Sequence, residues 1–327
     1  MKFFSDNPRN KDSFDGLIGR SPVMRNVFKL IEQVARTNVT VLISGESGTG
    51  KELVSFSIHS RSTRAKKPFI AVNMGAISPE LVISELFGHE KGAYTGAIER
   101  KAGRFERANT GTLFMDEIST MDHRTQISLL RVLETRRVHP IGARNSIPIN
   151  VRLIGATNKD LLDLVNSGKF REDLYYRFNV FTIQLPPLRD RKDDIPLIAN
   201  QYISHFAKRY KKKIKILSDD IVRRLCQYDW PGNVRELKNV IHRSVVLCEE
   251  EHLGIKHFPP RVIEHQADES EPYLKIRLGS TLIEAECEII RNTLVHTQYN
   301  KQKAAQILGI SRKSLYNKIH RYNLEGV

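Results

Sequence analysis

The chain has 327 residues and a formal net charge of +15, which favours a polyanionic partner such as nucleic acid without requiring one. Hydrophobic residues make up 40% and charged residues 27%, and no apolar run approaches the roughly 20 residues that a membrane helix needs. The first residues lack the apolar core of a secretory signal, and three scattered cysteines exclude a disulfide framework. We therefore expect a cytoplasmic protein that does not contact a membrane.

Five short apolar runs, separated by helical patterns, follow a polar tail over residues 1–13. The runs are NVTVLI (38–43), FIAVN (69–73), TLFMDE (112–117), NVRLIGA (150–156) and VFTIQL (180–185). This alternation is typical of a mostly parallel sheet covered by helices. It predicts an α/β domain over residues 14–185.

The rest of the chain has a helical pattern interrupted once. Residues 186–258 predict a helical lid subdomain, with Ser218 as a candidate N-cap of one of its helices. Residues 259–280 are Pro-rich and polar without periodicity, so we interpret them as a linker. Residues 281–327 predict a small all-α domain.

A candidate phosphate site follows the first predicted strand. GESGTGKE stands between that strand and a helical pattern, which is the context that a P-loop requires. Its glycines let backbone N–H groups face phosphate oxygens, and the lysine adds a point charge. A glycine-rich turn without a ligand is the alternative. The residues are Gly45, Glu46, Ser47, Gly48, Thr49, Gly50, Lys51 and Glu52, the last in place of the usual Ser or Thr ligand of Mg²⁺.

A pair of carboxylates ends the strand GTLFMDEI. Asp116 can hold Mg²⁺ through its waters, and Glu117 can orient or polarise an attacking water. An acidic pair at a strand end is often only a helix cap or a solvated turn. Together with a P-loop on the same sheet, the pair predicts nucleotide hydrolysis.

The C-terminal segment has the spacing of a helix-turn-helix. Ala305, Gly309 and Ile310 provide a small residue where helices cross and a glycine turn, and Ser311 can cap the second helix. Leu315 and Ile319 are expected to face the core, whereas Leu282, Ala285, Ile289 and Leu294 are expected to form a packing stripe on the preceding helix. The candidate DNA contacts are Ser311, Arg312, Lys313, Tyr316, Asn317 and Lys318. A solvated basic hairpin is the alternative.

The sequence GAYTGA stands between the phosphate motif and the acidic pair. Its members are Gly92, Ala93, Tyr94, Thr95, Gly96 and Ala97. Taken alone, the segment predicts a tight surface turn whose tyrosine packs back onto its own domain.

From about Phe14 to its C-terminus, the chain resembles bacterial enhancer-binding proteins, the AAA+ activators of sigma-54 RNA polymerase. The motifs that carry the resemblance occur in the family's order. They are LIGRSPVM, GESGTGKE, ELFGHEKGAYTGA, GTLFMDEI, GATNKDL, GKFREDLYYRFNVF, PPLRDRKDDI and WPGNVRELKN, followed by a Fis-type C-terminal domain. Glu52 after the P-loop lysine is the form that this family uses.

The resemblance implies roles for further residues. Asn73 would be the switch that positions Glu117, Asn158 would be sensor I, and Arg235 would be sensor II. Ile18 and Gly19 would lie near the adenine of ATP. Arg171 and Arg177 match the arginine fingers, which enter the site of the neighbouring subunit.

The resemblance also implies partners. GAYTGA would be the loop that touches sigma-54, with Tyr94 where the family usually has Phe. We expect ATP and Mg²⁺ as ligands, a hexamer when active, a dimer at rest, and a roughly palindromic upstream site in double-stranded DNA. With only about a dozen residues ahead of the ATPase domain, we expect no N-terminal regulatory domain on this chain. Control would then come from expression level or from a separate protein, or else the chain is trimmed from a longer one.

Two alternatives remain open at this point. One is a DNA-binding regulator whose AAA+ domain senses nucleotide and oligomerises without remodelling polymerase. The other is a remodelling ATPase of another kind, such as a protease unfoldase or a helicase loader, but those families lack GAYTGA and this C-terminal domain.

Overall fold

The computed structural model describes residues 13–94, 96–214, 217–263, 279–297, 299–322 and 324. They form two compact units, one ending at residue 263 and one beginning at residue 279, and each is described by itself. Most of the predicted tail and linker, and Thr95 of GAYTGA, lie outside the described residues. Among the helices described, none is long and apolar enough to cross a membrane.

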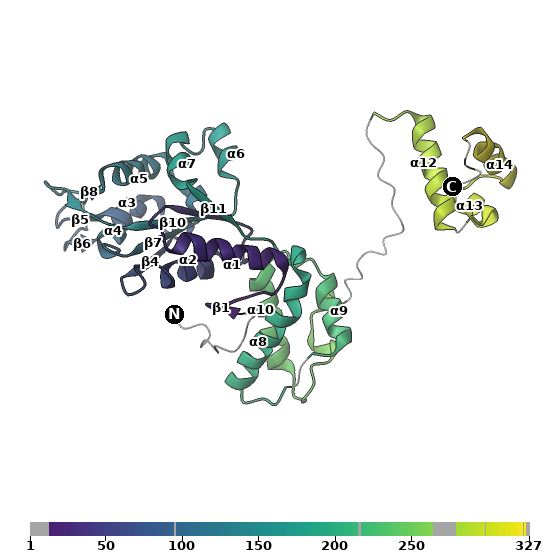
Figure 1. The fold of residues 1–327 in the computed structure, drawn as a ribbon, viewed down its shortest axis with the longest axis horizontal. Helices are drawn as coiled ribbons and strands as arrows, with labels where there is room; N and C mark the ends of the chain where they lie inside the picture. The colour runs from purple at the N-terminus through teal and green to yellow at the C-terminus, as the bar shows by residue number, and fades with distance from the viewer. Residues whose placement is uncertain are drawn as a thin grey trace. The chain divides into compact units, whose positions relative to one another are not determined.

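The first unit is built on a five-stranded parallel sheet with the strand order β11-β3-β10-β7-β4. Figure 1 labels β4, β7, β10 and β11 of this sheet. The strands are β3 (Val41–Ser44), β4 (Phe69–Asn73), β7 (Thr112–Asp116), β10 (Arg152–Thr157) and β11 (Phe181–Gln184). The predicted parallel α/β fold is confirmed. The first strand begins three residues later than predicted, because the pairing of β10 and β11 with β3 begins at Val41.

Helices cover both faces of the sheet, and alternate residues of each strand enter different cores. Val41 and Ile43 pack with α1 (Pro22–Ala35) and α2 (Lys51–Ser60), whereas Leu42 belongs to the core on the other face. That second core is covered by the remaining helices of the α/β part. They are α3 (Pro79–Phe87), α4 (Arg104–Arg107), α5 (His123–Thr135), α6 (Leu161–Asn166) and α7 (Glu172–Phe178).

Three two-stranded ribbons lie outside the main sheet. They pair β1 (Ser13–Phe14) with β2 (Leu17–Ile18), β5 (Gly88–His89) with β6 (Lys101–Ala102), and β8 (Arg137–Val138) with β9 (Ile147–Pro148). All three pairs are antiparallel. The ribbon of β5 and β6 flanks GAYTGA at both ends and therefore fixes where that loop leaves the domain.

The predicted helical lid follows β11 and has its own core around Trp230, whose side chain is fully buried. The indole of Trp230 donates a hydrogen bond to the carbonyl of Leu225 at 2.8 Å. Ser218 stands at the N-cap of α9 as predicted, without a side-chain capping bond. The helices are α8 (Ile195–Arg209), α9 (Asp219–Gln227), α10 (Asn233–Leu247) and α11 (Pro260–Ile263).

The second unit consists of α12 (Leu282–His296), α13 (Lys301–Ile307) and α14 (Arg312–Arg321). Ser311 caps α14 by accepting a bond from the N–H of Ser314 at 3.1 Å, and Gly309 adopts a φ of 63° in the turn. Leu315 and Ile319 are buried, so these three predictions are confirmed.

The predicted packing stripe on α12 is wrong in part. Leu294 is buried, but Leu282 is 89% exposed and Ile289 is 39% exposed, because the face of α12 that meets the other two helices carries Ile290 and Leu294. Apolar residues of α12 are therefore left on the surface of this unit.

Candidate functional site

The P-loop joins β3 to α2 and is shaped by three glycines. Gly45, Gly48 and Gly50 have φ values of 154°, 80° and 107°, a region that residues with a Cβ rarely adopt. Lys51 is buried, with 8% of its surface exposed. Its ammonium donates hydrogen bonds to the carbonyls of Gly45 at 2.7 Å and Glu46 at 3.0 Å. Burial lowers the pKa of Lys51, while the carboxylates of Asp116 and Glu117 oppose that shift. A cation and two carboxylates therefore share one electrostatic environment.

The acidic pair lies at the carboxyl edge of the sheet, where the strands present their last residues. Asp116 ends β7 and stands opposite Asn73, the last residue of β4. Asn158 directly follows β10, whose Thr157 stands opposite Ser44 at the end of β3. The parallel register thus brings four of the predicted positions to one edge.

Two neighbouring residues shape the acidic pair. Glu117 adopts a left-handed φ of 57° and donates its N–H to Asp116 Oδ1 at 2.9 Å. Its carboxylate occupies the space that a Cβ on Gly75 would fill. The Asn73 side-chain oxygen accepts from the N–H groups of Gly75 at 2.8 Å and Ala76 at 3.1 Å. Asn73 therefore positions the backbone beside Glu117.

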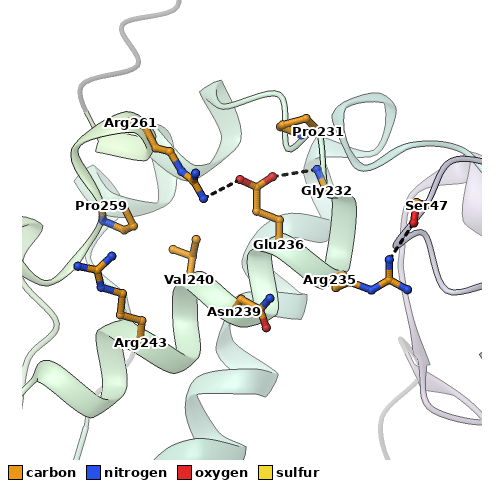
Figure 2. A pocket seen from close by; sticks show the side chains of 10 residues that line it. All are labelled: Ser47, Pro231, Gly232, Arg235, Glu236, Asn239, Val240, Arg243, Pro259 and Arg261. Atoms are coloured by element: carbon orange, nitrogen blue, oxygen red, sulfur yellow. Dashed lines mark hydrogen bonds and ion pairs between the residues drawn. The ribbon is translucent and has the colours of Figure 1, made fainter.

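The lid contacts the P-loop through the first turn of α10. Arg235 Nη1 donates to Ser47 Oγ at 2.8 Å, and its N–H donates to the Gly48 carbonyl at 3.3 Å. Figure 2 shows this contact at one end of a hollow of about 440 Å³ that runs along α10. The hollow is lined by Ser47, Pro231, Gly232, Arg235, Glu236, Asn239, Val240, Arg243, Pro259 and Arg261. The predicted sensor II position thus faces the P-loop.

A second set of contacts between lid and P-loop was missed by sequence reasoning. Glu46 accepts from Arg189 at 2.6 and 3.0 Å and from Asn233 Nδ2 at 3.0 Å. These hydrogen bonds lower the pKa of Glu46. Arg191, which is buried, donates to the Thr49 carbonyl at 3.1 Å. The lid residues that make these contacts belong to the motifs PPLRDRKDDI and WPGNVRELKN, so the resemblance could have pointed to them. The sequence alone assigns a role in these motifs to Arg235 only.

The segment that contains Ile18 and Gly19 is tied to the lid. The fully buried Asp194 accepts from the N–H groups of Arg20 at 2.7 Å and Ser21 at 2.9 Å, and from Ser21 Oγ at 2.7 Å. Ile18 packs against the lid core, and a Cβ on Gly19 would come within 3.1 Å of the Asp194 carboxylate. This segment therefore bridges the two parts of the unit.

The two candidate arginine fingers lie at α7. Arg171 is the N-cap of α7 and pairs with Asp173 at 2.7 Å, and this partner raises the pKa of Arg171. Arg177 is more exposed and lies 3.9 Å from a carboxylate oxygen of Glu134. Both guanidinium groups lie at the surface of the unit.

A buried glutamine, also missed from sequence, fixes the backbone at Arg171. Gln126 is fully buried in α5 and accepts the N–H of Arg171 at 2.9 Å. Its amide donates to the carbonyls of Met121 at 2.9 Å and Lys169 at 3.0 Å. Because Met121 directly follows the short helix after Glu117, Gln126 connects the acidic pair to the arginine segment.

The GAYTGA loop projects between β5 and β6. Gly92 and Gly96 have φ values of 79° and 102° with open space where a Cβ would stand. Tyr94 is 42% exposed, and its ring meets His89 edge-on at 5.0 Å between centroids. The tyrosine therefore packs partly on its own domain and presents the rest of its ring to solvent.

The candidate DNA contacts lie on α14 and at its N-cap Ser311, and all but one of those on the helix are exposed. Arg312, Lys313, Tyr316 and Asn317 are exposed, whereas Lys318 pairs with Glu286 of α12 at 2.5 Å. The ammonium of Lys301 lies 4.6 Å from the centre of the Tyr316 ring. Arg312 lies 5.9 Å from the centre of the same ring, while Lys313 and Asn317 point outward with no hydrogen bond or ion pair to another described residue.

The parallel sheet, the P-loop, the acidic pair and the helical lid define an AAA+ P-loop NTPase, and the second unit adds a helix-turn-helix. The family described as Sigma-54 interaction domain matches residues 17–184, AAA+ ATPase lid domain matches 189–274, and Bacterial regulatory protein, Fis family matches 281–322. The chain belongs to the sigma-54-dependent transcriptional activators.

Individual relatives agree with this assignment. Transcriptional regulatory protein ZraR of Escherichia coli K12 is 44% identical over 97% of this chain and 71% of its own length. FlbD of Caulobacter vibrioides is 41% identical over 95% of this chain and 71% of its own. The crystal structure of NtrX from Brucella abortus in complex with ATP has a TM-score of 0.70 at 32% identity, covering 97% of this chain and 71% of that one.

Proposed function

We propose that this protein binds DNA upstream of a promoter, assembles into a ring, and uses ATP hydrolysis to remodel the closed complex of sigma-54 RNA polymerase into the open complex. The observation that carries the proposal is the convergence of Lys51, the acidic pair and Arg235 on one edge of the sheet. A protein that only sensed nucleotide would not need Glu117 at that edge.

In this proposal the P-loop N–H groups and Lys51 hold the phosphates of ATP. Asp116 would hold Mg²⁺ through water, and the bound ion would neutralise charge on the phosphates. Glu117 orients the attacking water. Asn158 and Arg235 detect the γ phosphate from the sheet and from the lid.

The site is completed by a second copy of the chain. Arg171 and Arg177 lie at the surface on α7, which suits them to reach the site of a neighbour, and an arginine supplied in trans raises the rate of related reactions by about 10³ to 10⁵. Repeated head-to-tail contacts close into a ring, here a hexamer. The resting protein is a dimer.

The ring touches sigma-54 through GAYTGA. The two glycines allow the loop to change conformation, and the partly exposed ring of Tyr94 supplies contact area. Thr95 supplies a hydrogen-bonding group. Withdrawal of Tyr94 from His89 is the conformational change that nucleotide binding would control.

DNA is bound by α14 in the major groove. Arg312, Lys313 and Asn317 contact bases or phosphates, and two copies of the unit bind half-sites about one helical turn apart.

The experiment that tests the proposal measures the ATPase rate against protein concentration, followed by open-complex formation with sigma-54 polymerase. We expect the rate per subunit to rise steeply with concentration and to vanish in Glu117→Gln. Thr95→Ala should hydrolyse ATP but form no open complexes, with Tyr94→Phe as the matched control that retains both. A negligible ATPase at every concentration contradicts the proposal, and nucleotide-dependent assembly without hydrolysis supports the sensing alternative.

A further inference from the structure

The excess positive charge of this chain lies mostly outside the helix-turn-helix unit. Residues 281–327 hold seven Lys and Arg against four Asp and Glu, a net of +3 out of +15. By contrast, residues 195–218 of the lid hold six Lys and Arg and no acidic residue. Five of these six residues are described, and they lie at the end of α8 and in the loop that follows it; Lys215 lies outside the described residues.

Four of these cations are exposed and form the basic lid end, defined as Lys208, Arg209, Lys211 and Lys213. Within the described residues, the three lysines have no carboxylate in ion-pair distance, and Arg209 lies 5.9 Å from the centre of the Tyr210 ring. Cations elsewhere in this unit are commonly paired, as Arg100 is with Glu106 at 2.8 Å and Arg189 with Glu46 at 2.6 Å. The lysines of the basic lid end therefore lack an ion-pair partner among the described residues, although Glu249, Glu250 and Glu251 directly follow Cys248, to which the loop is anchored.

Lys212 holds the loop that presents these side chains. Its ammonium donates to the carbonyls of Val245 at 3.0 Å, Val246 at 2.7 Å and Cys248 at 2.7 Å, at the end of α10. Because this lysine is turned inward by three bonds, its neighbours Lys211 and Lys213 are left on the outer surface. The loop is thus anchored at its centre.

Lys211 occupies a position that favours glycine. Its φ is 55°, and the bonds from Lys211 N to Lys208 O at 3.3 Å and from Lys212 N to Ala207 O at 2.9 Å form a Schellman motif at the end of α8. Glycine is the usual residue at this left-handed position because a Cβ is unfavourable there. The favourable effect of a cation on a helix C-terminus accounts for Lys208 and Arg209, but a lysine at 211 carries a conformational cost.

We propose that the basic lid end contacts the phosphate backbone of DNA without reading its sequence. Lysines without ion-pair partners, on an anchored loop beside the partly exposed Tyr210, suit a polyanion, and the proposed function has this chain bind DNA. The inference rests on that function. The surface lies at the opposite end of α10 from Arg235, about 18 Å along the helix, so changes there leave the nucleotide site intact.

The test uses the full chain and a random-sequence DNA duplex of about 40 base pairs, with affinity measured between 50 and 200 mM salt. In Lys211→Gly/Lys213→Ala we expect the logarithmic salt slope to fall by about two, so that the parent loses about tenfold more affinity over this range than the variant. Lys66→Ala/Lys67→Ala removes the same charge from an exposed loop after α2 and should keep the parent slope. Lys211→Gly alone should raise the thermal unfolding midpoint while weakening DNA binding, which separates the effect from unfolding.

A variant slope equal to that of the parent overturns the proposal. The same holds if the variant binds DNA like the parent but fails in open-complex formation, a result that would assign the surface to an acidic protein. The helix-turn-helix is tested separately with Arg312→Ala/Lys313→Ala. If that variant still selected specific sites like the parent, the DNA-reading part of the proposed function would be wrong. The salt slope of the Lys211→Gly/Lys213→Ala variant would still test the basic lid end.

Discussion

Gly75 lies beside the Glu117 carboxylate and makes room for it. A Cβ at this position would overlap Glu117 Oε2, so Gly75→Ala must displace the group that we propose orients the attacking water. Because a displacement of about 1 Å can cost on the order of 10²-fold in rate, we expect kcat for ATP hydrolysis to fall to that extent while the Kd for ATP changes little.

Gly254→Ala is the matched control for this substitution. Residue 254 has an ordinary negative φ of −94°, and a Cβ there would meet atoms of His257 only at normal contact distance. It should hydrolyse ATP like the parent. If Gly75→Ala kept the parent kcat, Glu117 would have room to move without loss of function, and its proposed role would be wrong.

At the scale of elements, Glu46 joins the P-loop to the lid. Since its pKa is lowered in the folded protein, its bonds to Arg189 and Asn233 add stability above the ordinary glutamate pKa of about 4.3 and lose it as the pH falls through the lower folded value. We expect Glu46→Gln to lower the unfolding free energy by about 0.5 kcal/mol at pH 7, since the pair is partly exposed, and by progressively less below about pH 4.

Urea unfolding at a series of pH values checks this expectation. Glu250→Gln is the control, because it removes the same charge from an exposed lid ion pair with Lys256 and touches no P-loop atom. Weaker ATP binding is expected in Glu46→Gln alone. A stability difference that grew on acidification would contradict the assignment.

Gln126 makes a prediction about the connection between α5 and α7. Gln126→Leu keeps the volume but removes the bond to Arg171 N, so we expect ring assembly to persist and the ATPase rate to fall by about tenfold or more. Mixing this variant with Lys51→Ala should restore activity, because each Lys51→Ala subunit offers an intact Arg171 to a Gln126→Leu neighbour. A mixture no more active than Gln126→Leu alone would argue against an effect in trans.

The sequence predicted the elements better than the contacts between them. The strand pattern, the glycines of the P-loop and the acidic pair each lie within a few consecutive residues. The sequence alone could therefore predict that the P-loop and Asp116 share one sheet. The bonds of Glu46 to Arg189 and of Gln126 to Arg171 join residues 143 and 45 positions apart, and such pairs leave no periodic pattern. The exposed apolar face of α12 was mistaken for a core face for a related reason, since apolar spacing does not say whether the partner is the same chain or another.

At the scale of the whole molecule, that exposed face predicts how two copies meet. Leu282 and Ile289 lie seven residues apart on α12 and are 89% and 39% exposed. We expect Ile289→Glu to weaken dimerisation without nucleotide by about tenfold or more, because a charge would be buried in an apolar contact. Sedimentation analysis measures this, and Arg291→Glu, on an exposed residue nearby, is the control. Unchanged association would place the dimer contact elsewhere.

The buried carboxylate of Asp194 has a consequence for the order in which this protein forms. It holds the N–H groups of Arg20 and Ser21, and the first of these bonds joins residues 174 positions apart. At ribosomal rates of about 5 to 20 residues per second, Asp194 is synthesised roughly ten to thirty-five seconds after the turn at Gly19. This turn is therefore made early in translation and fixed only after the start of the lid has left the ribosome.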